Sequence, residues 1–279
     1  MMVKKRNWFG RIFEGIMLAS TVIGHWIIFY FIFVTACKDQ AEAARLTLAL
    51  PSEWKLWENI QYVMTFNNGL FVKSFWNSLR LTVCSIAILV FTSAMTAFIL
   101  QRKRGWISKV SDKLIIAGLI VPASVIPTYW VLSLLGIANT LTGLTLVEVA
   151  TLFPFAVMMY KGFIATLPRE LDEAAVIDGC GSVRLFFRII FPLLKPITMA
   201  VIILRSIVVY NDFQNPQYFM SGSDSQTVQL CVYLFKSSFT SHYGRLMAAV
   251  IIVSVPLLLL YIFLNKHIME GMTIGAVKG

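Results

Sequence analysis

Four side chains that are fully charged at neutral pH interrupt the long apolar runs of this 279-residue sequence: Arg80, Glu148, Arg205 and Asp212. If the runs cross a membrane, charged groups inside them are costly to bury and are candidates for handling an ion or a solute. Arg205 lies deepest in its run, whereas the other three lie near run ends, where a side chain can reach the polar interface. Arg205 is therefore the primary candidate for a functional charge, although it can also simply pair with a neighbouring carbonyl group.

A polar and aromatic cluster follows Arg205 and contains Tyr210, Asn211, Asp212 and Gln214. It combines a ring face with hydrogen-bonding groups, the mixture that a carbohydrate ligand requires. The end of a membrane helix beside an outer loop often has a similar composition. The cluster is thus either part of a solute pathway or an ordinary helix end.

Residues for catalysis or metal binding do not gather in any local motif. The four cysteines lack a CxxC or Cys/His spacing, and the three histidines are scattered. There is no GxxxxGK[ST] phosphate loop and no GxSxG elbow. Cys37 and Cys231 are either an outer disulfide or two thiols that pack as small apolar groups. We predict a protein that is not an enzyme, with no metal site and no cofactor of its own.

The composition predicts the elements that hold these residues. AVILMFWYC residues make up 58% of the chain, DEKR residues 14%, and the mean hydropathy is +0.75, against about 45–50% apolar and about 25% charged in soluble domains. The runs are too long and too uniformly apolar for barrel strands. The first is too long and bulky for a signal peptide and is kept as a mature helix. We predict an all-α membrane protein with six transmembrane helices, near 15–36, 76–100, 114–135, 144–160, 196–214 and 245–264.

Basic residues orient this helical domain. Sixteen of them fall in the N-tail 1–14, the loops 101–113 and 161–195, and the C-tail 265–279, against six in the opposite loops. Cytoplasmic loops carry the excess of Lys and Arg, so both termini are predicted to be cytoplasmic and residues 15–264 to form the transmembrane domain. Membrane topology thereby accounts for the formal charge of +10, and no nucleic-acid partner is expected.

The loop 161–195 is too long for a tight turn and predicts two short helices joined at Gly179. Thr166 and Pro168 start the first, and Ser182 is expected to cap the second. The second would present an apolar stripe that either lies on lipid headgroups or braces neighbouring helices: Val183, Phe186, Phe187 and Ile190. The small Ala174 and Ala175 beside Glu173 would let a basic partner surface approach closely.

These residues carry a family resemblance. Glu173-Ala174-Ala175, then Val176 to Asp178, Gly179, Ile189 and finally Phe191-Pro192, resemble the EAA loop (EAA-x3-G-x9-I-x-LP) of ABC-importer membrane subunits, with Phe191 for the usual Leu. The ending Gly271-Met272-Thr273-Ile274-Gly275-Ala276-Val277-Lys278-Gly279 is similar to that of carbohydrate-type permeases, the group of the smaller membrane subunit of the maltose transporter. The resemblance covers most of the chain.

The resemblance implies the type I ABC-importer permease architecture and several partners. The loop would dock on one of two ATPase subunits or domains, which hold the ATP and Mg. Its docking residues would be Glu173, Asp178 and Gly179, followed along the chain by Ile189 and Pro192. The tail 275–279 would reach the ATPase dimer, or is simply a frayed terminus. A second homologous permease, an extracytoplasmic solute-binding protein, a sugar and membrane lipid complete the expected assembly, in the cytoplasmic membrane of a bacterium or archaeon.

Other classes of protein account for some of the same residues. A permease for a non-sugar solute fits the same motifs. An ion-coupled secondary transporter would need acidic sites on broken midplane helices in two related repeats, which we do not find. An intramembrane enzyme would need a clustered acid–base or metal set, and a scaffold would leave the 161–195 loop unexplained.

Overall fold

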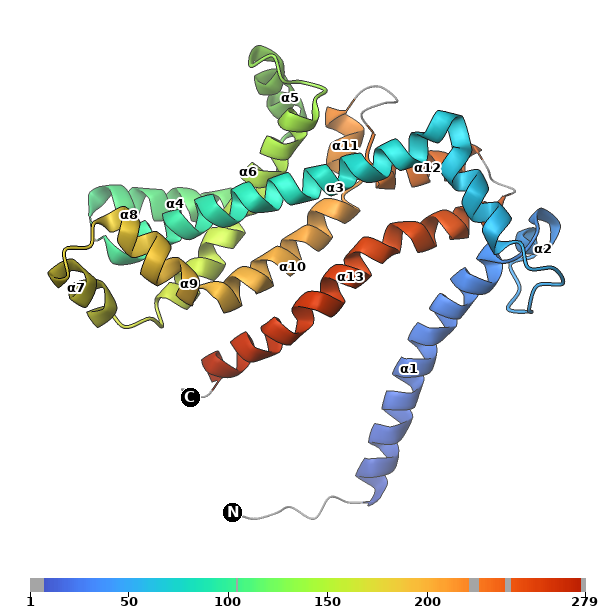
Figure 1. Cartoon of the computed structure of the whole chain (residues 1–279), viewed down its shortest axis with the longest axis horizontal. Coiled ribbons are helices and arrows are strands. Elements are labelled where there is room, and N and C mark those ends of the chain that lie inside the picture. The colour runs from blue at the N-terminus through green and yellow to red at the C-terminus, as the bar shows by residue number, and fades with distance from the viewer. Residues whose placement is uncertain (1–7, 104, 221–225, 239–241, 277–279) are drawn as a thin grey trace. The chain divides into compact units, whose positions relative to one another are not determined.

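The computed structural model describes residues 8–103, 105–220, 226–238 and 242–276. Every regular element in these ranges is helical, as predicted: α1 (Trp8–Ala36), α2 (Gln40–Ala44), α3 (Leu56–Arg102), α4 (Trp106–Ile120), α5 (Val125–Leu134), α6 (Leu141–Ile164), α7 (Glu170–Ile177), α8 (Ser182–Leu185), the π-helical turn η1 (Phe186–Ile190), α9 (Phe191–Leu193), α10 (Lys195–Asn211), α11 (Gln214–Phe219), α12 (Val228–Ser238) and α13 (Tyr243–Ala276) (Figure 1).

Four of the described helices are long and apolar enough to cross a membrane, and a fifth crossing results if the bent pair Ser182–Leu193 and Lys195–Asn211 counts as one. The four are Ile12–Ala36, Leu56–Arg102, Leu141–Ile164 and Tyr243–Leu264. They contain the predicted first, second, fourth and sixth spans. Six crossings and cytoplasmic termini stay predictions.

The predicted third span, 114–135, is broken in the structure. Its residues form two helices, α4 and α5, because the chain leaves helical geometry at Val121, whose φ is −72° and ψ is 123°. Pro122 disfavours the α conformation of the residue before it and has no N–H to donate. The predicted fifth span, 196–214, similarly ends early, since Asp212 is extended with ψ 125°.

The chain divides into two compact units, Met1–Phe71 with Val232–Ser254 and Val72–Cys231 with Val255–Gly279. In the first unit, Asn59 Nδ2 donates to the carbonyl groups of Ala36 and Lys38 at 2.9 and 3.0 Å. These bonds hold the end of α1 against the start of α3. The buried Lys38 donates from Nζ to the Thr47 carbonyl at 2.6 Å, so its charge is not left without a partner.

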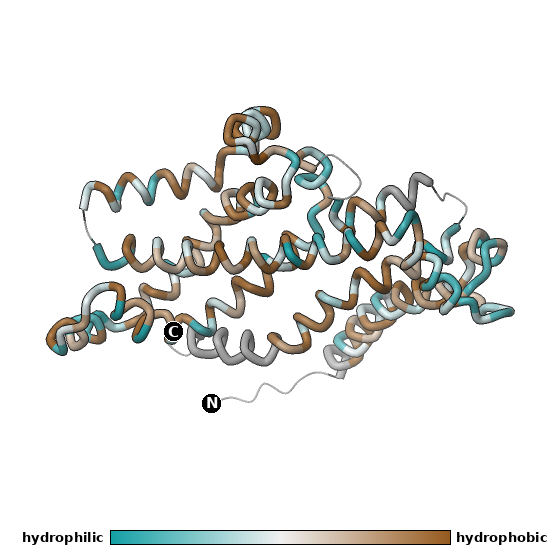
Figure 2. Tube along the Cα trace, turned by 45° about the horizontal axis from the view of Figure 1, so that its top comes forward, coloured by the Kyte–Doolittle hydropathy of each residue, from teal (hydrophilic) through white to brown (hydrophobic). Residues whose placement is uncertain are grey.

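The second unit has a core built around α6, which packs against α4, α10 and α11. The backbone of α4 comes close to α6 at Gly118, where a Cβ atom would lie 3.0 Å from Pro154 Cγ. Tyr160 in α6 is fully buried and its hydroxyl group donates to Thr198 Oγ1 in α10 at 3.1 Å. Hydrophobic residues follow most of the length of α6 and α10 (Figure 2). The unit therefore supplies a stable frame for the 161–195 loop.

Candidate functional site

The two short helices predicted for the 161–195 loop are present and meet at Gly179. Gly179 has φ +75°, and the backbone N–H groups of Gly179 and Cys180 donate to the carbonyl groups of Val176 and Ala175 at 3.0 and 2.9 Å. This paired pattern closes α7 as a Schellman motif, which needs a left-handed residue at the position of Gly179. We call the segment Glu170–Leu193 the knuckle.

The tip of the knuckle is exposed and mostly apolar. Ala175 is buried, but Val176, Ile177 and Val183 keep 63%, 85% and 71% of their surface exposed. The predicted docking residues Glu173, Ala174, Asp178 and Gly179 are exposed beside them. An exposed apolar patch with a polar rim marks a candidate protein contact surface.

An ion pair that the sequence reasoning missed anchors the knuckle to α3. Arg102 Nε lies 2.6 Å from Asp172 Oδ2, with both side chains largely buried, and Arg102 Nη2 donates to the carbonyl groups of Leu167 and Pro168 at 3.3 and 3.4 Å. One guanidinium group thus holds both the first turn of α7 and the chain leading into it. The sequence pattern indicated Asp172 only as an acid favoured by the helix N-terminus.

The second half of the knuckle differs from the predicted stripe. Phe186 and Ile190 are buried as expected, but Val183 and Phe187 are exposed. Leu185, which was not part of the predicted stripe, is buried instead. Phe187 lies within the π-helical turn Phe186–Ile190, where the 3.6-residue spacing behind the predicted stripe does not hold, whereas Val183 precedes this turn in the short helix α8. Ser182 is not the cap, since it begins α8 after Gly181. Ile189 is half-buried and Pro192 is exposed.

Aromatic rings attach this second half to α3. Phe191 stacks on Phe91 with ring centroids 5.4 Å apart, and Phe186 lies 5.6 Å from Phe98. Phe186 and Phe191 are themselves 5.7 Å apart. Of the two alternatives for the stripe, the buried part braces a neighbouring helix. The knuckle is consequently tied to α3 at both of its helices.

The predicted pathway residues fall into separate environments. The Cζ atom of Arg205 lies 3.9 Å above the Phe155 ring centroid. Asn211 Oδ1 accepts a hydrogen bond from Gln229 Nε2 at 3.0 Å. Asp212 Oδ1 accepts a hydrogen bond from the backbone N–H of Gln214 at 2.8 Å. The side chain of Gln214 is exposed. Asp212 is thus part of the turn into α11.

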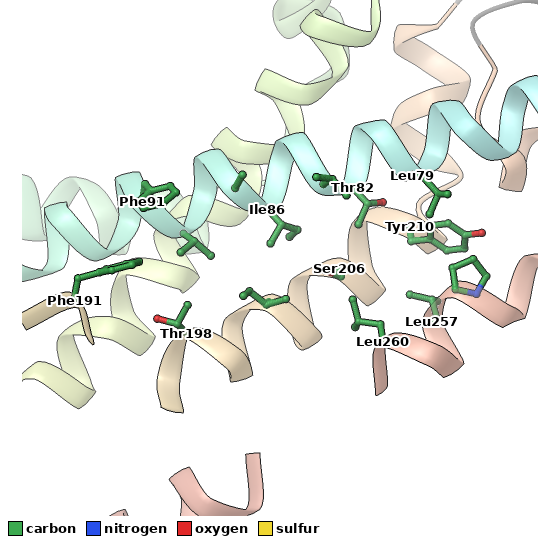
Figure 3. A pocket seen from close by; sticks show the side chains of 15 residues that line it. Leu79, Thr82, Ile86, Phe91, Phe191, Thr198, Ser206, Tyr210, Leu257 and Leu260 are labelled. Carbon is green, nitrogen blue, oxygen red and sulfur yellow. The ribbon is translucent and has the colours of Figure 1, made fainter. Parts of the chain in front are cut away.

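Tyr210 lines a cavity of about 460 Å³ between α3, α10 and residues 256–260 of α13. Figure 3 shows Thr198, Ser206 and Tyr210 on one wall, facing Thr82 and Ile86 of α3. The Tyr210 hydroxyl group is buried without a hydrogen-bond partner among the described residues. Arg205 does not line this cavity, because it points from α10 about 100° away from Ser206.

Glu148 does not extend to the membrane interface as the sequence suggested. It is 2% exposed, and its Oε1 accepts a hydrogen bond from Asn215 Nδ2 at 3.0 Å. The bond joins α6 to α11, and its partners are too far apart in the sequence for spacing to reveal. Arg80, in contrast, is exposed.

The cysteines, the possible metal ligands and the C-tail form no reactive or metal-binding site among the described residues. The four cysteines are free thiols, and burial raises the pKa of the Cys37 thiol above its ordinary value. The described residues contain no group of three metal-ligating side chains. In the C-tail, Gly275 and Ala276 lie at the end of α13, and Val277, Lys278 and Gly279 lie outside the described residues.

Long apolar helices that can cross a membrane, together with an exposed helical knuckle anchored to one of them, are the features expected of a membrane transport component. Residues 90–273 match the family "Binding-protein-dependent transport system inner membrane component", and the chain belongs to this family. It is therefore a multi-pass membrane protein and an ABC importer permease, not an enzyme.

Known proteins resemble the chain along most of its length. It is 29% identical to the melibiose/raffinose/stachyose import permease protein MelC of Bacillus subtilis, over 95% of each chain. It is 31% identical, again over 95% of each, to the probable starch degradation products transport system permease protein AmyC of Thermoanaerobacterium thermosulfurigenes. One chain in the crystal structure of a bacterial ABC transporter involved in the import of the acidic polysaccharide alginate matches 95% of this chain and 99% of its own length, with a TM-score of 0.82 at 17% identity. This match confirms the predicted permease fold.

Proposed function

We propose that this chain forms half of the translocation pathway of an importer for a sugar or oligosaccharide and that its knuckle receives the motion of a partner ATPase. The observation that carries the proposal is the knuckle itself, whose tip is exposed while its base is fixed to α3 by Arg102 and by stacked rings. A force applied at such a tip is passed to the part of α3 that follows the break in its helix at residues 66–69, instead of bending the loop. The chain then needs no nucleotide site of its own.

The proposed assembly has the partners expected from the sequence. A second homologous permease completes the pathway, two ATPase subunits or domains hold ATP and Mg, and an extracytoplasmic binding protein delivers the solute. Residues 15–264 form the transmembrane domain, with residues 1–14 and 265–279 in the cytoplasm of a bacterium or archaeon. Gly275 to Gly279 reach toward the ATPase dimer.

A sugar is the proposed solute because the similar permeases named above are described as importing sugars or starch products. Tyr210 and Ser206 line the 460 Å³ cavity, whose surface is otherwise mostly apolar. Arg205 and Asn211 lie on the same helix, and Asp212 and Gln214 follow its end. We propose that these residues line the pathway. Candidate sugars bound by the co-purifying binding protein identify the solute, and a binding protein that retains only non-sugar solutes would refute the sugar assignment.

The coupling role is tested by Glu173→Lys in the purified transporter reconstituted into liposomes. The change reverses the charge at the exposed docking face, so we expect the protein to insert normally while ATP-driven uptake falls at least tenfold, the equivalent of about 1.4 kcal/mol. Glu170→Lys is the matched control, since it makes the same charge change one turn earlier in α7. Uptake at the control level in Glu173→Lys would contradict the coupling role.

A further inference from the structure

A second hollow of about 670 Å³ lies between the C-terminal end of α3 and the start of α4, away from the cavity described above. Its walls are mainly apolar, with hydroxyl groups from three residues and one lysine: Thr96, Ile99, Leu100, Lys103, Trp106, Ile107, Ser108 and Ser111. The chain crosses between the two helices at Gly105, which also lines the hollow. An apolar interior with a cationic rim fits an amphiphile that carries an acidic head.

The charges around the hollow are unequal. Arg102 is engaged by Asp172, and the one acid of residues 101–113, Asp112, forms an ion pair with Lys161. Lys103, Lys109 and Lys113 are exposed, and the last two are four residues apart on the same side of α4. The rim is therefore positive, with its neighbouring acid already paired.

The turn beside the hollow exposes aromatic and aliphatic groups, as a segment at a membrane surface does. Trp106 is 78% exposed and Ile107 is 72% exposed, although both belong to a helix end rich in lysine. Tryptophan next to lysine is the composition found at the level of lipid headgroups.

We propose that this hollow binds an anionic phospholipid, with an acyl chain between α3 and α4 and the headgroup phosphate at Lys103. Lys109 and Lys113 add to the attraction without lining the hollow. Each lysine near an anionic lipid contributes about fivefold in affinity. The proposal requires only that the chain spans a bilayer, so it does not depend on the coupling role of the knuckle.

Native mass spectrometry of the purified full-length chain tests the site, with titrated phosphatidylglycerol and phosphatidylcholine as probes. We expect a preference for phosphatidylglycerol that drops about fivefold in Lys103→Gln and about a hundredfold when Lys109 and Lys113 are also changed to Gln. The matched control is Lys195→Gln, which removes an exposed lysine outside the hollow. Equal retention of both lipids, or an equal loss in the control, would overturn the proposal.

A second variant tests the hollow itself. Gly105 has φ −169°, extended backbone that any residue adopts, and a Cβ atom there would meet nothing within 4 Å. Gly105→Phe therefore adds bulk without backbone strain, and we expect it to reduce phosphatidylglycerol binding while the thermal unfolding temperature in detergent is unchanged. Binding that survives this change, or a photo-crosslinker at Lys103 that captures a protein chain instead of lipid, would overturn the assignment.

Discussion

Gly179 shows how one backbone angle shapes the exposed tip. At φ +75° a side chain costs about 1–2 kcal/mol, and since a Cβ atom at this position would meet nothing within 4 Å, the cost is conformational and not steric. We expect Gly179→Ala to lower ATP-driven uptake and Gly179→Pro to abolish it, while both proteins still insert. Gly179→Asn is the control, because asparagine tolerates the left-handed region. If alanine and asparagine behave alike in the uptake assay, backbone geometry at this position does not matter for transport.

Arg205 places a charged group on an apolar helix, and this group contacts the aromatic ring of Phe155. Its Cζ atom lies 3.9 Å from the Phe155 ring centroid, a contact of about 0.5–2 kcal/mol. We expect Arg205→Ala to reduce uptake by more than it reduces co-purification of the partner subunits, and Arg205→Lys to retain an intermediate rate because it keeps the charge. Comparing uptake with subunit recovery separates the two effects, and a variant that only fails to assemble would assign Arg205 a structural role.

Helix ends that depend on a single residue could be predicted from the sequence. The stop at Gly179 and the existence of two short helices were predictable, because one residue with a left-handed angle is enough to end a helix. The π-helical turn was not, since a 3.6-residue pattern assumes regular helix. The break in α4–α5 had a visible signal in Pro122, but a proline in a membrane helix produces either a kink or a break.

Contacts between residues far apart in the sequence could not be predicted from local spacing. Glu148 meets Asn215, and Arg102 meets Asp172, only after α6 and the knuckle have packed. Nothing in the local spacing distinguishes Arg102 from the neighbouring basic residues. The docking face of the candidate site was thus predictable, whereas the contacts that hold it in place were not.

The attachment of α7 to α3 depends on the Arg102–Asp172 pair. The two side chains are 11% and 18% exposed, so Arg102→Leu leaves a mostly buried carboxylate, and we expect a loss of about 2–3 kcal/mol, slightly below that for a fully buried pair. Arg102→Leu with Asp172→Leu should recover part of this loss, because no charge is then left unpaired. Thermal unfolding in detergent measures both, with the exposed Arg184→Leu as control. A double variant less stable than the single one would contradict this account of the anchor.

For the whole molecule, the decisive question is on which side of the membrane the knuckle lies. The excess of basic residues in the 101–113 and 161–195 loops predicts the cytoplasm, where an ATPase can reach the exposed tip. Ser182 is exposed at the start of α8 and Ser52 is exposed in the loop before α3. In a Cys180→Ser background, we expect a membrane-impermeant maleimide to label Ser182→Cys in inside-out vesicles and Ser52→Cys in right-side-out vesicles. The opposite pattern would place the knuckle outside the cell and remove the physical basis for coupling to a cytoplasmic ATPase.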